Sequence, residues 1–106
     1  MASDNPSEQA VLVYLDGIVL PSEVYERNDL ATLEDQLIAV IERQALGELD
    51  GNEIGEEGAV IFMYGQDAER LYAGIEPTLR SYPLCKGARV VIRFGEPGAS
   101  QREITL

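Results

Sequence analysis

The sequence predicts an α+β fold, a ferredoxin-like βαββαβ sandwich with two helices on one face of an antiparallel sheet. Two segments carry apolar residues spaced by three and four positions, as amphipathic helices do. Residues 59–64 are apolar, rich in β-branched and aromatic residues and bounded by glycines, which is typical of a central strand. Further strand patterns lie near both ends of the chain. Right-handed crossovers then give the strand order 4-1-3-2, with residues 10–20 and 59–64 in the middle.

The chain begins with a polar segment that has almost nothing to bury. Residues 1–9 are therefore expected to form a disordered tail, and residues 10–106 a single domain. Residues 10–15 form the first strand, with apolar residues on both of its faces. Asp16–Gly17 can close a hairpin or mark a bulge in one strand that runs to residue 20. The bulge is favoured, because the three residues before Pro21 make a poor hairpin arm.

The first helix is expected from Leu30 to about Ala45. Its apolar stripe consists of Leu30, Leu33, Leu37, Val40 and Ile41. Asn28 or Asp29 can cap its first turn, and Thr32 with Asp35 offers a later start. Gly47 lies just beyond the helix, where a residue with positive φ commonly ends it.

The middle of the chain is expected to form a hairpin that leads into the second helix. Residues 48–54 are polar enough for an edge strand, and residues 56–58 turn the chain into the strand 59–64. The second helix covers residues 68–80, with Asp67 as its cap. Pro77 should remove one hydrogen bond and kink this helix.

The chain ends with strand patterns. Residues 82–87 form a loop, and residues 88–94 a strand in which Val90, Ile92 and Phe94 share one face. A turn at residues 95–100 lets residues 102–106 pair back as a possible extra C-terminal strand.

The chain is strongly acidic, with 19 acidic and 8 basic residues among 106 and a net charge of −11. Phosphate backbones and anionic membrane surfaces are repelled, so we expect neither nucleic acid nor membrane as a partner. A basic protein would be attracted, although such charge more often serves solubility. One cysteine, no signal-peptide pattern at the start and no apolar run near the ~20 residues of a spanning helix favour the cytoplasm.

No catalytic residue, metal site or cofactor is predicted. The chain lacks histidine, the usual general base and a common metal ligand. Cys85 is expected to be a structural thiol, despite its neighbour Lys86. The acidic segment 50–57 partly matches a calcium loop, but Ile54 and Ile61 stand where that loop needs oxygen ligands, which favours a solvated turn. Arg89 and Arg93 share one strand face, as a solvent-facing pair that balances carboxylates would.

The strands at the centre of the sheet are apolar on both faces, although helices cover only one. The uncovered face should therefore carry large apolar side chains, and such a patch usually marks an interface. Tyr14 is one candidate, with either Phe62 and Tyr64 or Ile61 and Met63.

Three short motifs resemble those of a family of small bacterial proteins. They are DGNEIG at residues 50–55, YGQDA at residues 64–68, and KGARV through RFG within residues 86–95. The resemblance spans roughly residues 10–95. It implies a ferredoxin-like fold and no assigned activity.

These observations favour a non-enzymatic, homodimeric interaction protein of the bacterial cytoplasm. One form of this function is an immunity-type protein whose acidity neutralises a basic toxin. The alternative is a small-molecule-binding or catalytic module that uses the uncovered sheet face. An RNA-binding module would need a basic rim that the sequence lacks.

Overall fold

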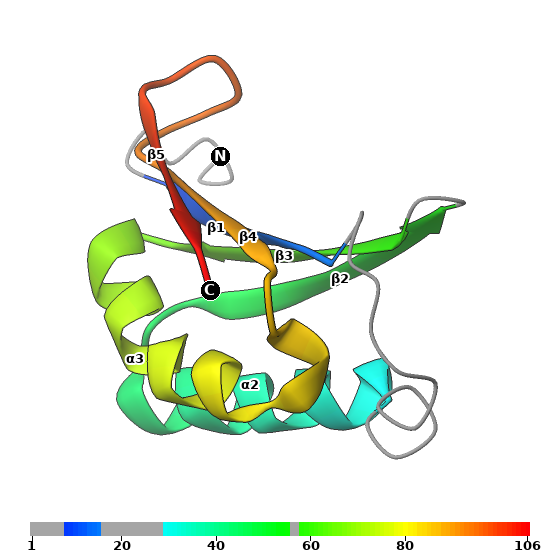
Figure 1. Cartoon of the computed structure of the whole chain (residues 1–106). Coiled ribbons are helices and arrows are strands. Elements are labelled where there is room, and N and C mark those ends of the chain that lie inside the picture. Colours follow the sequence, from blue (N-terminus) through cyan, green and yellow to red (C-terminus); the bar gives the residue numbers. More distant parts are fainter. Residues whose placement is uncertain (1–7, 16–28, 56–57) are drawn as a thin grey trace.

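The computed structural model describes residues 8–15, 29–55 and 58–106. It has an α+β fold in which a five-stranded antiparallel sheet packs with two helices. Figure 1 shows both helices against the same face of the sheet. The elements in chain order are β1 (Gln9–Tyr14), α2 (Leu30–Gln44), β2 (Glu48–Gly55), β3 (Gly58–Gly65), α3 (Ala68–Ser81), the 3-10 turn η2 (Pro83–Cys85), β4 (Arg89–Arg93) and β5 (Gln101–Thr105).

The order of the strands in the sheet is β2-β3-β1-β4-β5. The possible extra C-terminal strand is present as β5, which pairs antiparallel with β4. The sheet therefore differs from the four-stranded order 4-1-3-2 by an added strand beside β4, and β1 becomes its central strand. Because β5 lies at the edge of the sheet, it does not fold over the face opposite the helices.

The first strand begins earlier than the expected boundary between tail and domain. Gln9 belongs to β1, and its side-chain Oε1 accepts a hydrogen bond of 2.8 Å from the backbone N–H of Ala68 at the start of α3. Gln9 is thus part of the domain and not of the tail. The rest of the expected tail up to residue 7, the hairpin or bulge at Asp16–Gly17 and the turn at residues 56–57 lie outside the described residues.

Helix α2 begins at the earlier of its two expected starts. The Oδ1 atom of Asp29 accepts a 2.8 Å hydrogen bond from the backbone N–H of Thr32. Hydrogen bonding from Thr32, first from its side chain and second from this backbone N–H, lowers the pKa of the Asp29 carboxyl group. The prediction that Gly47 ends the helix with a positive φ is wrong. Ala45, with φ 54°, takes the left-handed conformation at the end of the helix. Gly47 also has a positive φ, 141°. Its lack of a side chain lets its backbone lie close to the backbone of Tyr64 and Gly65.

Helix α3 begins with the expected cap. The Oδ1 atom of Asp67 accepts a 3.1 Å hydrogen bond from the backbone N–H of Arg70. Pro77 lies inside the helix without ending it, and the helix continues to Ser81. Within the described part of the chain, no helix has the length and apolar character needed to cross a membrane.

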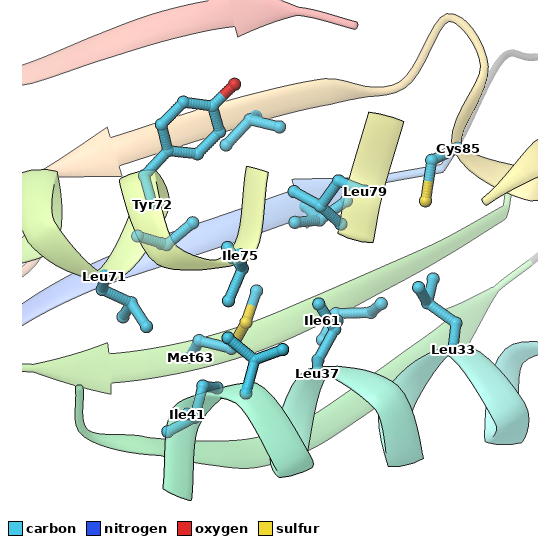
Figure 2. Packing of buried hydrophobic residues seen from close by; sticks show 14 of the residues in the cluster. Leu33, Leu37, Ile41, Ile61, Met63, Leu71, Tyr72, Ile75, Leu79 and Cys85 are labelled. Atoms are coloured by element: carbon cyan, nitrogen blue, oxygen red, sulfur yellow. The ribbon is translucent and has the colours of Figure 1, made fainter. Parts of the chain in front are cut away.

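The main core lies between the helices and the sheet. Strand β3 contributes Ile61 and Met63, which Figure 2 shows between the side chains of α2 and α3. The other fully buried large residues of this core are Val11, Val13, Leu33, Leu37, Ile41, Leu71, Ile75, Leu79, Val90 and Ile92. Phe94 was expected to continue the alternation of Val90 and Ile92, but β4 ends at Arg93 and Phe94 is 36% exposed. The main core thus contains the side chains from one face of the central strands, and the side chains of the opposite face lie outside it.

Candidate functional site on the open face of the sheet

The sheet face away from the helices, called the open face below, has an apolar band at its centre. A second, smaller cluster of buried residues forms this band, separate from the main core. Its buried members are Ala10, Leu12 and Val91, and the partly buried residues packed against them are Tyr14, Val60, Phe62 and Tyr64. Large apolar side chains thus remain partly accessible in the middle of a sheet, where a single helical layer does not reach them.

The structure decides which set of residues on β3 belongs to the open face. Phe62 and Tyr64 lie there together with Tyr14 of β1. Ile61 and Met63 are fully buried against the helices, so these two candidates are corrected from interface to core residues. Residues i and i+2 of a strand share a face. On β3 the odd-numbered residues Ile61 and Met63 pack under α2 and α3, and the even-numbered residues lie on the open face.

The pairing of the strands arranges the open face in three rows that cross the sheet. Cross-strand partners lie on the same face, so the registers define these rows. In the order β2 to β5, the first row is Glu48, Tyr64, Ala10, Arg93 and Gln101. The second row is Gly51, Phe62, Leu12, Val91 and Glu103. The third row is Glu53, Val60, Tyr14, Arg89 and Thr105.

Opposite charges flank the apolar band on its two sides. On β2 the flanking side chains are Glu48 and Glu53, which are both exposed. On β4 they are Arg89 and Arg93, which are both partly exposed. The open face is thus acidic along one edge of the band and basic along the other, although the chain as a whole carries a net charge of −11.

Arg89 connects the basic edge to its neighbours on the same sheet. Its guanidinium carbon lies 4.3 Å from the centre of the Tyr14 ring, a cation–π contact. Its Nη1 atom is 2.9 Å from Oε2 of Glu103 on β5, in an ion pair in which both side chains remain partly exposed. Arg89 therefore covers one side of Tyr14 and leaves part of its own side chain accessible. The sequence-based expectation of a solvent-facing arginine that balances a carboxylate agrees with this pair.

A hollow of about 380 Å³ lies at the acidic edge of the open face. Phe62 and Tyr64 form its apolar wall, and its other lining residues are Asp50, Gly51, Asn52 and Glu53 of β2. The register of β2 against β3 shifts between Leu49 and Gly51, so Asp50 is an extra residue at a bulge. The hollow lies beside Gly51, the position in the middle row without a side chain.

The acidic segment that partly matched a calcium loop is an extended strand. Asn52 pairs with Ile61 on the helix side, and its Nδ2 donates a 2.8 Å hydrogen bond to Oε2 of Glu34 on α2. Glu53 pairs with Val60 and so points to the open face. Successive strand residues point to opposite faces, which separates ligands that a loop would gather. Among the residues that the structure describes, no group of three or more acidic or cysteine side chains could hold a metal ion.

A larger hollow, of about 510 Å³, lies where α2 ends and α3 begins. Its lining is mostly polar and includes Asp67 and Arg70. Both residues already take part in the cap of α3, where Asp67 accepts the hydrogen bond from the backbone of Arg70. The positions of Asp67 and Arg70 are thus explained by their role in capping α3. We therefore place the functional surface on the open face and not at this hollow.

Cys85 is part of the main core. Burial raises the pKa of its thiol to about 12, well above its ordinary value of 9.0. In the unfolded chain the thiol loses its proton first, so the contribution of this group to stability is complete below pH 9.0 and is lost as the pH rises toward 12. A neutral, inaccessible thiol is a poor nucleophile.

We therefore expect a thiol-reactive reagent at pH 8 to modify Cys85 slowly in the native protein and rapidly in guanidinium chloride. Labelling with Ellman's reagent, followed by its absorbance with and without denaturant, measures both rates. Rapid labelling of the native protein would contradict the structural role of Cys85.

The sequence indicates Tyr14 and two alternative residue pairs for the open face, and it places Arg89 and Arg93 on one strand face, but it does not single out Glu48 and Glu53. In the sequence, Glu48 and Glu53 look like ordinary residues of an edge strand. The alternation of residues along a strand indicates which residues of that strand share a face. It does not indicate which strands lie side by side in the sheet. The pairing of β2 with β3 and of β4 with β1 brings the two charged edges to either side of one band.

Comparisons of the chain with protein-family models, curated proteins and solved structures found no match.

Proposed function

We propose that this protein is a non-enzymatic interaction module of the bacterial cytoplasm that acts as a homodimer through its open face. One observation carries the proposal. Tyr14, Phe62 and Tyr64 lie partly exposed at the centre of a five-stranded sheet, around Leu12 and Val91, on the face that neither helix covers. A contiguous apolar patch of this kind is costly to leave in water and is typical of protein interfaces.

The chemistry of the side chains supports a binding role and not a catalytic one. The chain has no histidine to act as a general base. The thiol of Cys85, whose pKa burial raises to about 12, is held neutral in the core. The aromatic residues of the apolar band and the two arginines beside it are of types that interfaces favour.

We also assign the fold to the ferredoxin-like class, with β5 as an addition at one edge. Without β5 the strand order is β2-β3-β1-β4, and the element order is βαββαβ. The assignment to bacteria rests on the motif resemblance at residues 50–55, 64–68 and 86–95. The assignment to the cytoplasm rests on the single cysteine.

The open face has the size of a weak or transient interface. Four strands at about 4.8 Å spacing and about seven residues of about 3.3 Å each give a footprint of about 440 Å² per subunit. This is smaller than the footprint of about 800 Å² per partner of a standard interface. We therefore expect a dissociation constant in the micromolar range, and sedimentation at tens to hundreds of micromolar protein tests it. A single species of 11.6 kDa over that range would overturn the proposal.

Salt is expected to strengthen the homodimer. Two subunits that each carry −11 repel each other at long range, and the Debye length falls from ~30 Å at 0.01 M salt to ~8 Å at 0.15 M. Association measured by sedimentation should therefore increase between these two salt concentrations. The immunity-type form of the function predicts the reverse for binding to a basic protein, because salt screens that attraction. A homodimer that weakens steadily over this range of salt would show that attraction between opposite charges across the interface outweighs the repulsion between the two net charges, and would contradict the role given to net charge.

The hollow at the acidic edge favours one second candidate, a small-molecule-binding module. Its wall of Phe62 and Tyr64 could stack a flat ring, and Asp50 and Glu53 could bind a cationic group. The two functions compete for one surface. A cationic aromatic compound that binds monomers and dissociates the dimer in sedimentation would favour the ligand-binding function, whereas a dimer that is indifferent to such compounds favours the interaction module.

A further inference from the structure

The positions of the charged residues on the open face restrict how two copies of the protein can be oriented in a dimer. The first row holds Glu48 on β2 and Arg93 on β4, and the third row holds Glu53 on β2 and Arg89 on β4. Each outer row thus has one carboxylate and one guanidinium group, on opposite sides of the apolar band. The middle row carries no charge between β2 and β4, where it consists of Gly51, Phe62, Leu12 and Val91.

We propose that two subunits stack open face to open face about a two-fold axis that runs parallel to the strands, between β1 and β3. This inference rests on the homodimer proposed above. Rotation about this axis keeps each row in place and lays β4 of one subunit over β2 of the other. Arg93 then faces Glu48 of the partner subunit, and Arg89 faces Glu53 of the partner subunit. The symmetry forms each pair twice, so four intersubunit ion pairs surround the apolar band.

The same axis also matches the sizes of the facing side chains. It lays β3 over β1, so that Tyr64 meets Ala10 and Phe62 meets Leu12 of the partner subunit. It also lays Val91 over Gly51, which has no side chain and borders the hollow beside Phe62. At Tyr64 over Ala10 and at Val91 over Gly51 a larger side chain thus faces a small residue, which helps the two sheets to interdigitate.

A two-fold axis perpendicular to the strands gives the opposite electrostatic result. It exchanges the first and third rows and lays each strand over itself. Arg89 would then face Arg93, and Glu48 would face Glu53, so that like charges meet at all four outer positions. Like charges brought together at an interface disfavour that arrangement, and the distribution of charge therefore selects the axis parallel to the strands.

Aligned sheets usually pack at about 30° to each other because each sheet is twisted. This angle displaces the outer rows by a few ångströms relative to a flat overlay. Glutamate and arginine have long, flexible side chains, and Glu48 and Glu53 lie exposed on the edge strand β2. The proposed pairs can therefore form at the twisted interface without a change in the register of the strands.

Reversal of one charge distinguishes the two axes by the sign of its effect. With the axis parallel to the strands, Glu53→Arg brings two arginines together at two symmetric positions and should weaken dimerisation by about tenfold or more. With the perpendicular axis, the same change would place an arginine over Glu48 and strengthen the dimer. Glu53→Gln is the matched control, and it should give a smaller loss because it removes attraction without adding repulsion. Sedimentation equilibrium at fixed salt measures all three proteins.

The double variant Glu53→Arg/Arg89→Glu should restore most of the affinity, because it exchanges the two members of one pair. Arg89 also contacts Glu103 and Tyr14 within its own subunit, and the Nε atom of Arg93 donates a 2.8 Å hydrogen bond to the carbonyl oxygen of Gly95. Because these local contacts differ, Glu48→Arg with Arg93→Glu provides a second, independent exchange. A wild-type monomer at all concentrations overturns the homodimer itself. A wild-type dimer that tightens with Glu53→Arg leaves the homodimer standing and overturns the proposed axis. A dimer that neither Glu53→Arg nor Glu48→Arg affects, each made alone, also overturns the axis.

Discussion

Replacing Phe62 with aspartate is expected to convert the dimer to a monomer. Phe62 lies in the middle row of the open face, between Gly51 and Leu12, at the centre of the apolar band. The change would bury one carboxylate from each subunit near the two-fold axis, without a partner for either. Burial of an unpaired polar group costs several kcal/mol, so the dissociation constant should rise by more than about 100-fold. Sedimentation equilibrium measures this change directly.

Ile54→Asp is the matched control for Phe62→Asp. Ile54 is 74% exposed, and it pairs with Ala59 on the opposite face of β2 from Glu53. The control introduces the same charge into the same hairpin outside the proposed interface, and it should leave the dimer intact apart from a small effect of net charge. Thermal unfolding by circular dichroism establishes that both variants are folded. A dimer that survives Phe62→Asp with unchanged affinity would contradict the role of the open face.

Replacing Gly47 with alanine is expected to be among the most destabilising small changes in the chain. A Cβ atom at Gly47 would overlap the carbonyl oxygen of Tyr64 and lie 2.8 Å from the Cα atom of Gly65. These neighbours are backbone atoms of β3, which cannot move without disturbing its pairing with β2. The φ of 141° adds strain for a residue with a side chain. We expect a loss of about 3 kcal/mol or more, which lowers the melting temperature by more than about 10 °C.

Gly98→Ala separates the two causes. Gly98 has a φ of 101°, but a Cβ atom there would have no heavy atom within 4 Å. This variant therefore carries the backbone strain without the overlap, and we expect it to cost about 1–2 kcal/mol. Both melting temperatures should be measured at one protein concentration, because dimerisation contributes to apparent stability. Equal losses in the two variants would show that the close approach at Gly47 contributes little.

The sequence by itself predicted the two helices, the main strands and the α+β class. The apolar stripe from Leu30 to Ile41 predicted α2, and Asp67 with the apolar periodicity after it predicted α3. These signals are local, because a helix's hydrogen bonds and its apolar face depend on residues three and four positions apart. The polarity of β2 likewise predicted a strand at the edge of the sheet. Ala45, by contrast, ends α2 in a left-handed conformation that its residue type did not predict.

The tertiary structure alone decided which side chains form the open face. Residues 59–64 are apolar at both odd and even positions, so their alternation could not tell Ile61 and Met63 from Phe62 and Tyr64. Packing under the two helices buried the first pair and left the second on the open face. The placement of Glu48 and Glu53 on one side of the band, and of Arg89 and Arg93 on the other, depends on strand pairing between distant segments. Residues that share a row can lie as far apart in the chain as Ala10 and Gln101, and no local pattern along the chain encodes such a juxtaposition.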